Sequence, residues 1–101
     1  MEDSNSIYLD LIEKTAFIQT VQQILDSLPA EAKEKIRNTK KDDLSLFHFG
    51  LGTWIRNNIL TKDSGIFYVF IENEILHKDD MSEIIIRELH KSLCKTEANK
   101  K

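Results

Sequence analysis

Apolar residues recur every three or four positions along most of the chain, with polar residues between them. The first clear row is Ile18, Val21, Leu25 and Leu28. This period of about 3.6 residues is typical of an amphipathic helix. Pro29 interrupts the row and suits the first turn of a second, shorter helix over AEAKEKIRN. The sequence therefore predicts two helices before residue 39.

The next segment is apolar around more than half of its circumference. A polar link contains Asp42 and Asp43, either of which suits the N-cap of a third helix running to about Leu60. On a helical wheel, two polar residues, His48 and Asn58, fall within its apolar face. A helix of this kind is usually covered by neighbours on several sides. We therefore predict that residues 43–60 form the central helix of the fold.

The run IFYVFIENEIL admits two interpretations. Its β-branched and aromatic content suits a strand, whereas the spacing of its apolar residues suits one face of a helix. A lone strand has no partner elsewhere in the sequence, so we favour a helix over residues 65–76. TKDSG separates this run from the preceding segment, and Asp63 or Ser64 suits its N-cap.

The last predicted helix has the clearest start. In HKDDMSEIIIRELHKSL, Asp80 precedes Glu83 by three residues, which is the spacing of a capping box. Basic residues follow later in the same segment, as the helix dipole favours. We expect its buried row to comprise Met81, Ile84, Ile85, Leu89 and Leu93.

Length and turn-forming residues define the predicted fold class. A chain of 101 residues supports one core. One proline and three glycines are too few for a many-stranded β fold. We predict an all-α fold, a single small bundle of four to five helices around the helix at 43–60. We expect residues 1–14 to be an N-terminal extension with the capacity for a short helix, residues 15–95 to be the helical domain, and residues 96–101 to be a disordered tail.

Charge and cysteine content exclude several classes of protein. The formal net charge of −3 and the pI near 5.6 lack the basic footprint of general nucleic-acid binding. The basic run within residues 33–41 is interpreted as a solvated face. A single cysteine, Cys94, cannot form an intrachain disulfide, and the start of the chain lacks the layout of a signal peptide. No apolar run approaches the roughly 20 residues of a membrane span. We expect a cytoplasmic protein with no membrane or nucleic-acid partner.

The stretch HFGLGTWIRNN, residues 48–58, concentrates the unusual residues of the chain. It contains two of the three glycines, Gly50 and Gly52, and the single tryptophan, Trp54. Each glycine costs about 1 kcal/mol relative to alanine inside a helix, so an offsetting contact is expected. Close approach of another helix or of a ligand to the bare backbone is the natural source of that contact.

Two interpretations of this stretch are open. In the first, His48, Gly52 and Arg56 lie one helical turn apart, and the imidazole and guanidinium hold a carboxylate or phosphate, with nearby asparagines as further donors. In the second, Arg56 pairs with an acidic residue of its own chain, Asp79 or Asp80. The histidine and asparagine on the apolar face then join neighbouring helices.

Catalytic and metal chemistry are not expected. The three histidines and Cys94, which follows His90 by four residues, complete no ligand set of the CxxC or HExxH kind. A cysteine in a final helical turn lacks an activating environment for nucleophilic chemistry. The paired acids at helix starts are explained by capping. We therefore expect no enzyme activity, no metal and no cofactor.

The pairing of HFGLGTWIRNN with the downstream HKDDMSEIII resembles a family of small bacterial proteins classed as a domain of unknown function. Its members carry an H-F-G-x-G-x-x-I-R-N-N core followed by an H-P-D-D-x-S helix start. The likeness covers residues 15–93, with Lys78 where proline is usual. The resemblance implies a helix over residues 65–76 and a link between Arg56 and Asp79 or Asp80. It implies no activity.

Two functions follow as hypotheses. The first is a non-enzymatic protein-interaction domain of bacterial or phage origin, of a regulatory, immunity or anti-defence inhibitor type. It rests on Leu46, Phe49 and Leu60 and on the IFYVF run, which together exceed what a chain of this size is expected to bury. Its partner would be another protein, and a homo-oligomer also fits. The second is a small-ligand module that holds an anionic or nucleotide group.

The candidate residues for a ligand or partner site are His48, Gly50, Gly52, Trp54, Arg56, Asn57, Asn58, Asp79 and Asp80.

Overall fold

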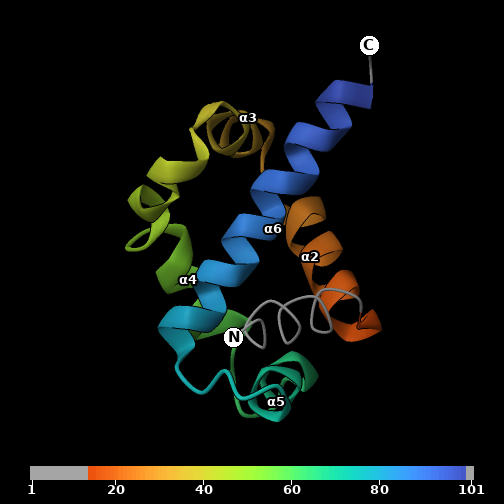
Figure 1. The fold of residues 1–101 in the computed structure, drawn as a ribbon, viewed down its shortest axis with the longest axis vertical. Helices are drawn as coiled ribbons and strands as arrows, with labels where there is room; N and C mark the ends of the chain where they lie inside the picture. The colour runs from red at the N-terminus through yellow and green to blue at the C-terminus, as the bar shows by residue number, and fades with distance from the viewer. Residues whose placement is uncertain (1–13, 100–101) are drawn as a thin grey trace, which may run out of the picture.

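The computed structural model describes residues 14–99, and every regular element in that range is helical (Figure 1). In chain order the elements are α2 (Thr15–Ser27), α3 (Ala30–Asn38), the 3₁₀ helix η1 (Lys41–Phe47), α4 (Leu51–Asn58), α5 (Gly65–Glu72) and α6 (Lys78–Asn99). The all-α prediction is confirmed for this part of the chain. The predicted N-terminal extension, apart from Lys14, lies outside the described residues.

The longest helix, α6, is the element around which the others pack. Figure 1 shows α6 running through the length of the molecule, with α2 along one side and α3, η1 and α4 along the other. The short helix α5 packs on α2, near the end where α6 begins. The prediction of a central helix at 43–60 is therefore wrong, because α6 occupies the central position.

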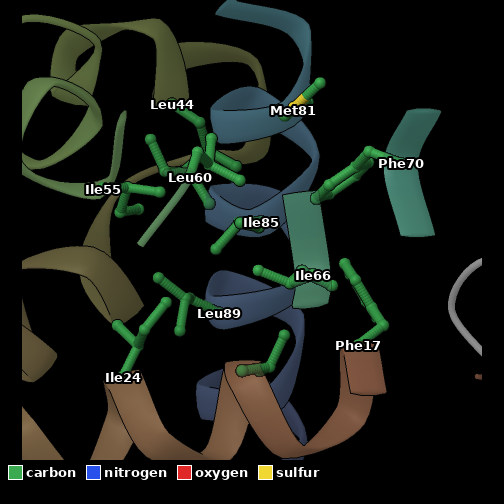
Figure 2. Close-up of a cluster of buried hydrophobic side chains, with 12 residues drawn as sticks. Phe17, Ile24, Leu44, Ile55, Leu60, Ile66, Phe70, Met81, Ile85 and Leu89 are labelled. Carbon is green, nitrogen blue, oxygen red and sulfur yellow. The ribbon is translucent and has the colours of Figure 1, made fainter. Parts of the chain in front are cut away.

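The core lies between α6 and its neighbours (Figure 2). On α6, Met81, Ile85 and Leu89 are fully buried, as the apolar spacing predicts, whereas Ile84 and Leu93 are only partly buried. The other buried members of the core cluster are Phe17, Val21, Ile24, Leu44, Ile55, Leu60, Ile66, Phe70 and Ile86. Within residues 14–99, every α-helix except α3 contributes to this cluster, so the cluster joins most of the described fold.

The buried face of α2 is rotated from the predicted one. Phe17, Val21 and Ile24 are buried, whereas Ile18 is exposed. The Phe17 ring meets the Phe70 ring of α5 edge to face, with centroids 6.0 Å apart. An aromatic side chain buries more area than a branched aliphatic one and gains from such a pair. Phe17 therefore decides which face of α2 turns inward.

Residues 43–60 do not form one helix. The chain follows η1 to Phe47, turns through residues 48–50 and starts α4 at Leu51. Gly50 is the N-cap of α4, with φ −90° and ψ −85°, outside the α-helical region. Its carbonyl accepts a hydrogen bond from the Trp54 N–H at 3.2 Å. The helical wheel fails here because it applies one helical period to the whole of residues 43–60, which the turn at residues 48–50 interrupts.

Two of the three predicted N-caps are wrong. Ser64 caps α5 as predicted, because its Oγ accepts a hydrogen bond from a backbone N–H of the first turn at 3.4 Å. In contrast, α6 begins at Lys78, so Asp80 lies inside the first turn. Asp42 and Asp43 likewise lie inside the first turn of η1. Acidic side chains there still interact favourably with the positive end of a helix.

The run at residues 65–76 is a helix followed by a left-handed turn. The prediction of a helix rather than a strand is confirmed for residues 65–72. After it, the N–H of Glu74 donates to the Ile71 carbonyl and the N–H of Ile75 donates to the Phe70 carbonyl, both at 3.0 Å. These two bonds form a Schellman motif. Glu74 has φ 67°, a conformation that costs a residue with a Cβ about 1–2 kcal/mol.

The backbone of α6 continues to Asn99, past the predicted domain boundary at residue 95 and into the predicted tail. None of the helices within residues 14–99 combines the length and apolar composition that a membrane crossing requires.

Glu74→Gly is expected to raise the free energy of unfolding by about 1 kcal/mol, because glycine adopts a positive φ without a steric penalty. Urea-induced unfolding of the two proteins measures the difference. Glu72→Gly, at the last helical position of α5, is the matched control and should lower the free energy of unfolding by up to about 1 kcal/mol. Shifts of the same sign in both variants would contradict this account.

Candidate functional site

The short helix η1 presents separate rows of side chains, because a 3₁₀ helix has three residues per turn. Leu44 and Phe47 form the inner row and pack into or against the core. In the turn after η1, His48 lines the groove between η1 and α6. Leu46 of η1 and Phe49 of that turn are 76% and 84% exposed. Different residues of η1 and the following turn thus face the core, the groove and the solvent.

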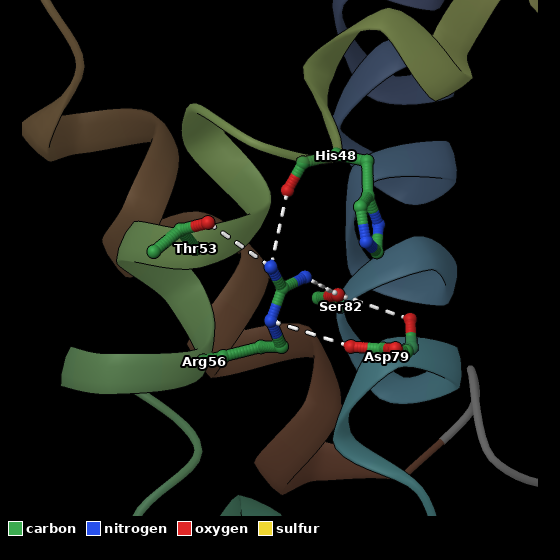
Figure 3. A network of polar contacts seen from close by, with 5 residues as sticks. All are labelled: His48, Thr53, Arg56, Asp79 and Ser82. Carbon is green, nitrogen blue, oxygen red and sulfur yellow. Dashed lines mark hydrogen bonds and ion pairs between the residues drawn. The ribbon is translucent and has the colours of Figure 1, made fainter.

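The guanidinium of Arg56 lies in a network drawn from η1, α4 and α6 (Figure 3). Its Nη1 donates to Ser82 Oγ at 3.0 Å, its Nη2 donates to Thr53 Oγ1 at 3.0 Å and to the His48 carbonyl at 3.2 Å, and its Nε lies 3.5 Å from Asp79 Oδ1. Each guanidinium nitrogen therefore has a partner within the chain.

We expect the hydrogen bonds from the guanidinium to neutral acceptors to stabilise this network more than the ion pair does. The Arg56 side chain is 15% exposed, whereas the Asp79 side chain is 69% exposed. An ion pair with such an exposed carboxylate is screened by water and stabilises by at most about 1 kcal/mol. Ser82 is fully buried, and its hydroxyl accepts from Arg56 while donating to the Asp79 carbonyl at 3.0 Å. Because both side chains are largely buried, the loss of either one would leave the other without a hydrogen-bond partner, at a cost in stability.

Gly52 makes room for the Arg56 side chain. A Cβ on Gly52 would lie 3.0 Å from Arg56 Nη1, 3.3 Å from the Phe47 carbonyl oxygen and 3.8 Å from the Ile86 side chain. The close approach expected at this glycine is therefore made by groups of the chain itself. At Gly50 no atom lies within 4 Å of the equivalent Cβ position, so its role is in the turn.

The other predicted site residues lie apart from the guanidinium in the described contacts. The His48 ring packs edge to face on Phe49, with centroids 4.9 Å apart, and only its carbonyl meets Arg56. Asn58 is exposed, and its amide donates to the Trp54 carbonyl at 3.0 Å. The remaining members of the predicted set, Asn57 and Asp80, are exposed on α4 and in the first turn of α6.

The sequence interpretation did not include two partners of Arg56, Thr53 and Ser82. Helical spacing carries a signal for both of them. Thr53 precedes Arg56 by three residues, and Ser82 follows Asp79 by three, so each pair lies on one face of its helix. The expected link between Arg56 and Asp79 is present, whereas Asp80 does not provide it.

His90 and Cys94 of α6 bind the C-terminal end of α3. His90 Nε2 lies 2.8 Å from the Thr39 carbonyl. A carbonyl only accepts, so Nε2 is the donor in this contact. Cys94 Sγ lies 3.5 Å from that nitrogen and donates to the Arg37 carbonyl at 3.7 Å. The pair therefore satisfies carbonyls at a helix end.

An open groove of about 1510 Å³ runs between η1 and α6. Leu44 and Ile84 contribute apolar surface, and Lys91 and Glu83 are among the charged residues of both signs that line it. Among the residues that the structure describes, no three His, Cys, Asp or Glu side chains come together in a way that could hold a metal ion. The mixed charge of the groove favours neither an anion nor a cation.

The fold and the network define a small all-helical domain in which one guanidinium joins α4 and the end of η1 to the central helix. A family model, described as Domain of unknown function (DUF6794), matches residues 15–93. The chain belongs to this family. The resemblance seen in the paired motifs is thus confirmed at the level of a domain of unknown function. No curated protein and no solved structure matched the chain.

Arg56→Met is expected to lower the free energy of unfolding by about 2–3 kcal/mol, because it removes hydrogen bonds from a charged donor to partly buried acceptors. Asp79→Asn should lower it by less than about 1 kcal/mol, since that carboxylate is exposed. Arg56→Lys should restore less than half of the loss, because an ammonium lacks the guanidinium fork. Urea-induced unfolding compares the three variants. Equal losses in Arg56→Met and Asp79→Asn would show that the ion pair dominates.

Gly52→Ala is expected to lower the free energy of unfolding by about 1–2 kcal/mol, although alanine has the higher helix propensity, because the new methyl crowds Arg56 and the Phe47 carbonyl. Gly65→Ala is the matched control, since no atom lies within 4 Å of its Cβ position. It should leave stability unchanged or raise it. Thermal unfolding of the two variants shows whether the steric effect of the new methyl outweighs the higher helix propensity of alanine. A Gly52→Ala protein more stable than the unmodified chain would contradict the steric argument.

Proposed function

We propose that this chain is a non-enzymatic domain that binds another protein through the outer side of η1 and α4. The observation that carries the proposal is the exposure of two large apolar side chains, Leu46 near the end of η1 and Phe49 in the turn that follows it. Trp54, in the first turn of α4, is also exposed. We call Leu46, Phe49 and Trp54 the η1–α4 surface. Large aromatic and aliphatic side chains of this kind supply most of the binding energy where proteins dock.

Rigid support of the η1–α4 surface favours the same function. Leu44 and Phe47 anchor the inner row of η1, and Arg56 holds the His48 carbonyl in the turn that carries Phe49. The His48 ring adds an edge-to-face contact with Phe49. Side chains that are already positioned lose less conformational entropy on binding.

The anionic-ligand alternative receives less support from these residues. The nitrogens of Arg56 already have partners, so a phosphate would have to displace Asp79 or a neutral acceptor. The His48 ring packs on Phe49 rather than beside the guanidinium. Exchange of one bound anion for another yields little net binding energy. We therefore keep protein binding as the proposed function.

The partner that we propose is a different protein with an apolar recess that accepts Phe49 and Trp54 and with a basic rim. The negative net charge of the chain favours such a rim through electrostatic complementarity. Small size and acidity also suit a regulatory, immunity or anti-defence inhibitor of bacterial or phage origin, and that assignment is part of the proposal.

Fluorescence of Trp54, the single tryptophan, reports directly on the η1–α4 surface. We expect the full chain to retain a protein from a lysate of its source organism, and titration with that purified protein to shift Trp54 emission to shorter wavelength. Phe49→Asp should weaken the measured affinity by about 30-fold or more, which corresponds to loss of a central contact.

Leu76→Asp is the matched control, because Leu76 is also an exposed apolar residue but lies on the link between α5 and α6. It should bind as the unmodified chain does. Equal retention by Phe49→Asp would contradict the proposal. A shift of Trp54 emission with the concentration of the chain alone would assign the surface to a second copy instead.

A further inference from the structure

The groove between η1 and α6 has two distinct ends, because the two helices run in opposite directions. His90 Nε2 lies 2.8 Å from the Thr39 carbonyl, so η1 begins beside the C-terminal half of α6. Arg56 donates both to the His48 carbonyl and to Ser82 Oγ, so η1 ends beside the N-terminal half of α6. Each end of the groove is therefore formed by one end of η1 and the opposite end of α6.

One end of the groove is basic. Lys41 at the start of η1 and Lys91 and Lys95 on α6 line it and are exposed, together with one acidic residue, Asp42. Lys41 is far from the other two lysines in the sequence, and packing of η1 on α6 brings the three to the same end. The fold thus gives a chain of net negative charge a local positive surface.

The other end of the groove is acidic. Glu83 and Glu88 on α6 and Glu74 in the turn before α6 line it, together with one basic residue, Arg87, which pairs with Glu83 at 3.0 Å. From Glu83 to Lys95 the helix rises about 18 Å. This exceeds the screening length of about 10 Å in about 0.1 M salt. The two ends therefore act as separate surfaces of opposite charge.

A groove with one basic and one acidic end is complementary to a second copy of itself. A two-fold axis across the groove sets the α6 helices of two copies antiparallel, so the basic end of each copy meets the acidic end of the other. The apolar surface that Leu44 and Ile84 contribute to the groove then leaves contact with water. A groove lined by one sign of charge would instead repel its own copy.

We propose that the chain forms a two-fold symmetric dimer through this groove, with the basic end of each copy on the acidic end of the other. Leu46, Phe49 and Trp54 are not among the residues that line the groove. The dimer therefore leaves the η1–α4 surface of each copy open, and it does not depend on the proposed binding of a different protein.

Reversal of the charge at either end tests the reciprocal contact. We expect light scattering to show a dimer of the full chain at tens of micromolar. Glu83→Lys and Lys91→Glu should each raise the Kd of the dimer by about 100-fold or more, because two-fold symmetry sets like charges together twice. An equimolar mixture of the two variants should form a dimer again, since one variant then has two basic ends and the other has two acidic ends.

Recovery of the dimer in the mixture also shows that each variant is folded. The proposal would be overturned by a full chain that stays monomeric, by single variants that dimerise as the unmodified chain does, or by a mixture that stays monomeric. Lys62→Glu is the matched control, because Lys62 is an exposed lysine between α4 and α5 that does not line the groove. It should dimerise as the unmodified chain does.

Salt and tryptophan fluorescence separate this interface from the η1–α4 surface. Raising the ionic strength from about 0.1 M to about 1 M shortens the screening length from about 10 Å to about 3 Å and should weaken the dimer. Emission of Trp54 should stay constant as the dimer forms, because Trp54 does not line the groove. A shift of that emission would assign the dimer to the η1–α4 surface and overturn the proposal.

Discussion

The hydrogen-bonded guanidinium of Arg56 is the contact on which the arrangement of α4, η1 and α6 depends. It meets Ser82 on α6, the His48 carbonyl at the end of η1 and Thr53 on its own helix. An arginine can do this because its donors point in several directions and its charge persists when it is partly buried. Small residues make the space: Gly52 lies beneath the guanidinium, and the Ser82 hydroxyl lies beside it.

This contact explains how a small domain keeps large apolar side chains in solvent without losing its fold. The inner row of η1 and the fully buried residues of α6 form the core, while the network holds the turn at residues 48–50 from the polar side. Phe49 projects from that held turn, so its exposure follows from the position of the turn. A fixed turn and an exposed aromatic side chain are the features on which the proposal of a protein-binding surface rests.

Sequence periodicity predicted the helices whose apolar rows are regular and failed where the period changes. The α6 row at Met81, Ile85 and Leu89 was predicted correctly. Leu44 and Phe47 are three residues apart, a spacing that suits both a 3₁₀ helix and an α-helix, so the break before α4 was missed. The paired motifs indicated that Arg56 meets Asp79 or Asp80, but a helical wheel describes one helix at a time and gives no register between two helices. Ser82 was therefore not predicted as a partner.

Amide hydrogen exchange of Arg56→Met, measured residue by residue against the unmodified chain, tests the central claim most directly. If the guanidinium holds the turn and α4 on α6, amides of residues 48–58 will exchange by local opening, at least about 10-fold faster than amides of α2, which report global unfolding. A uniform change in exchange across α2, α4 and α6 would contradict the account, because Arg56 would then add to overall stability without positioning this segment.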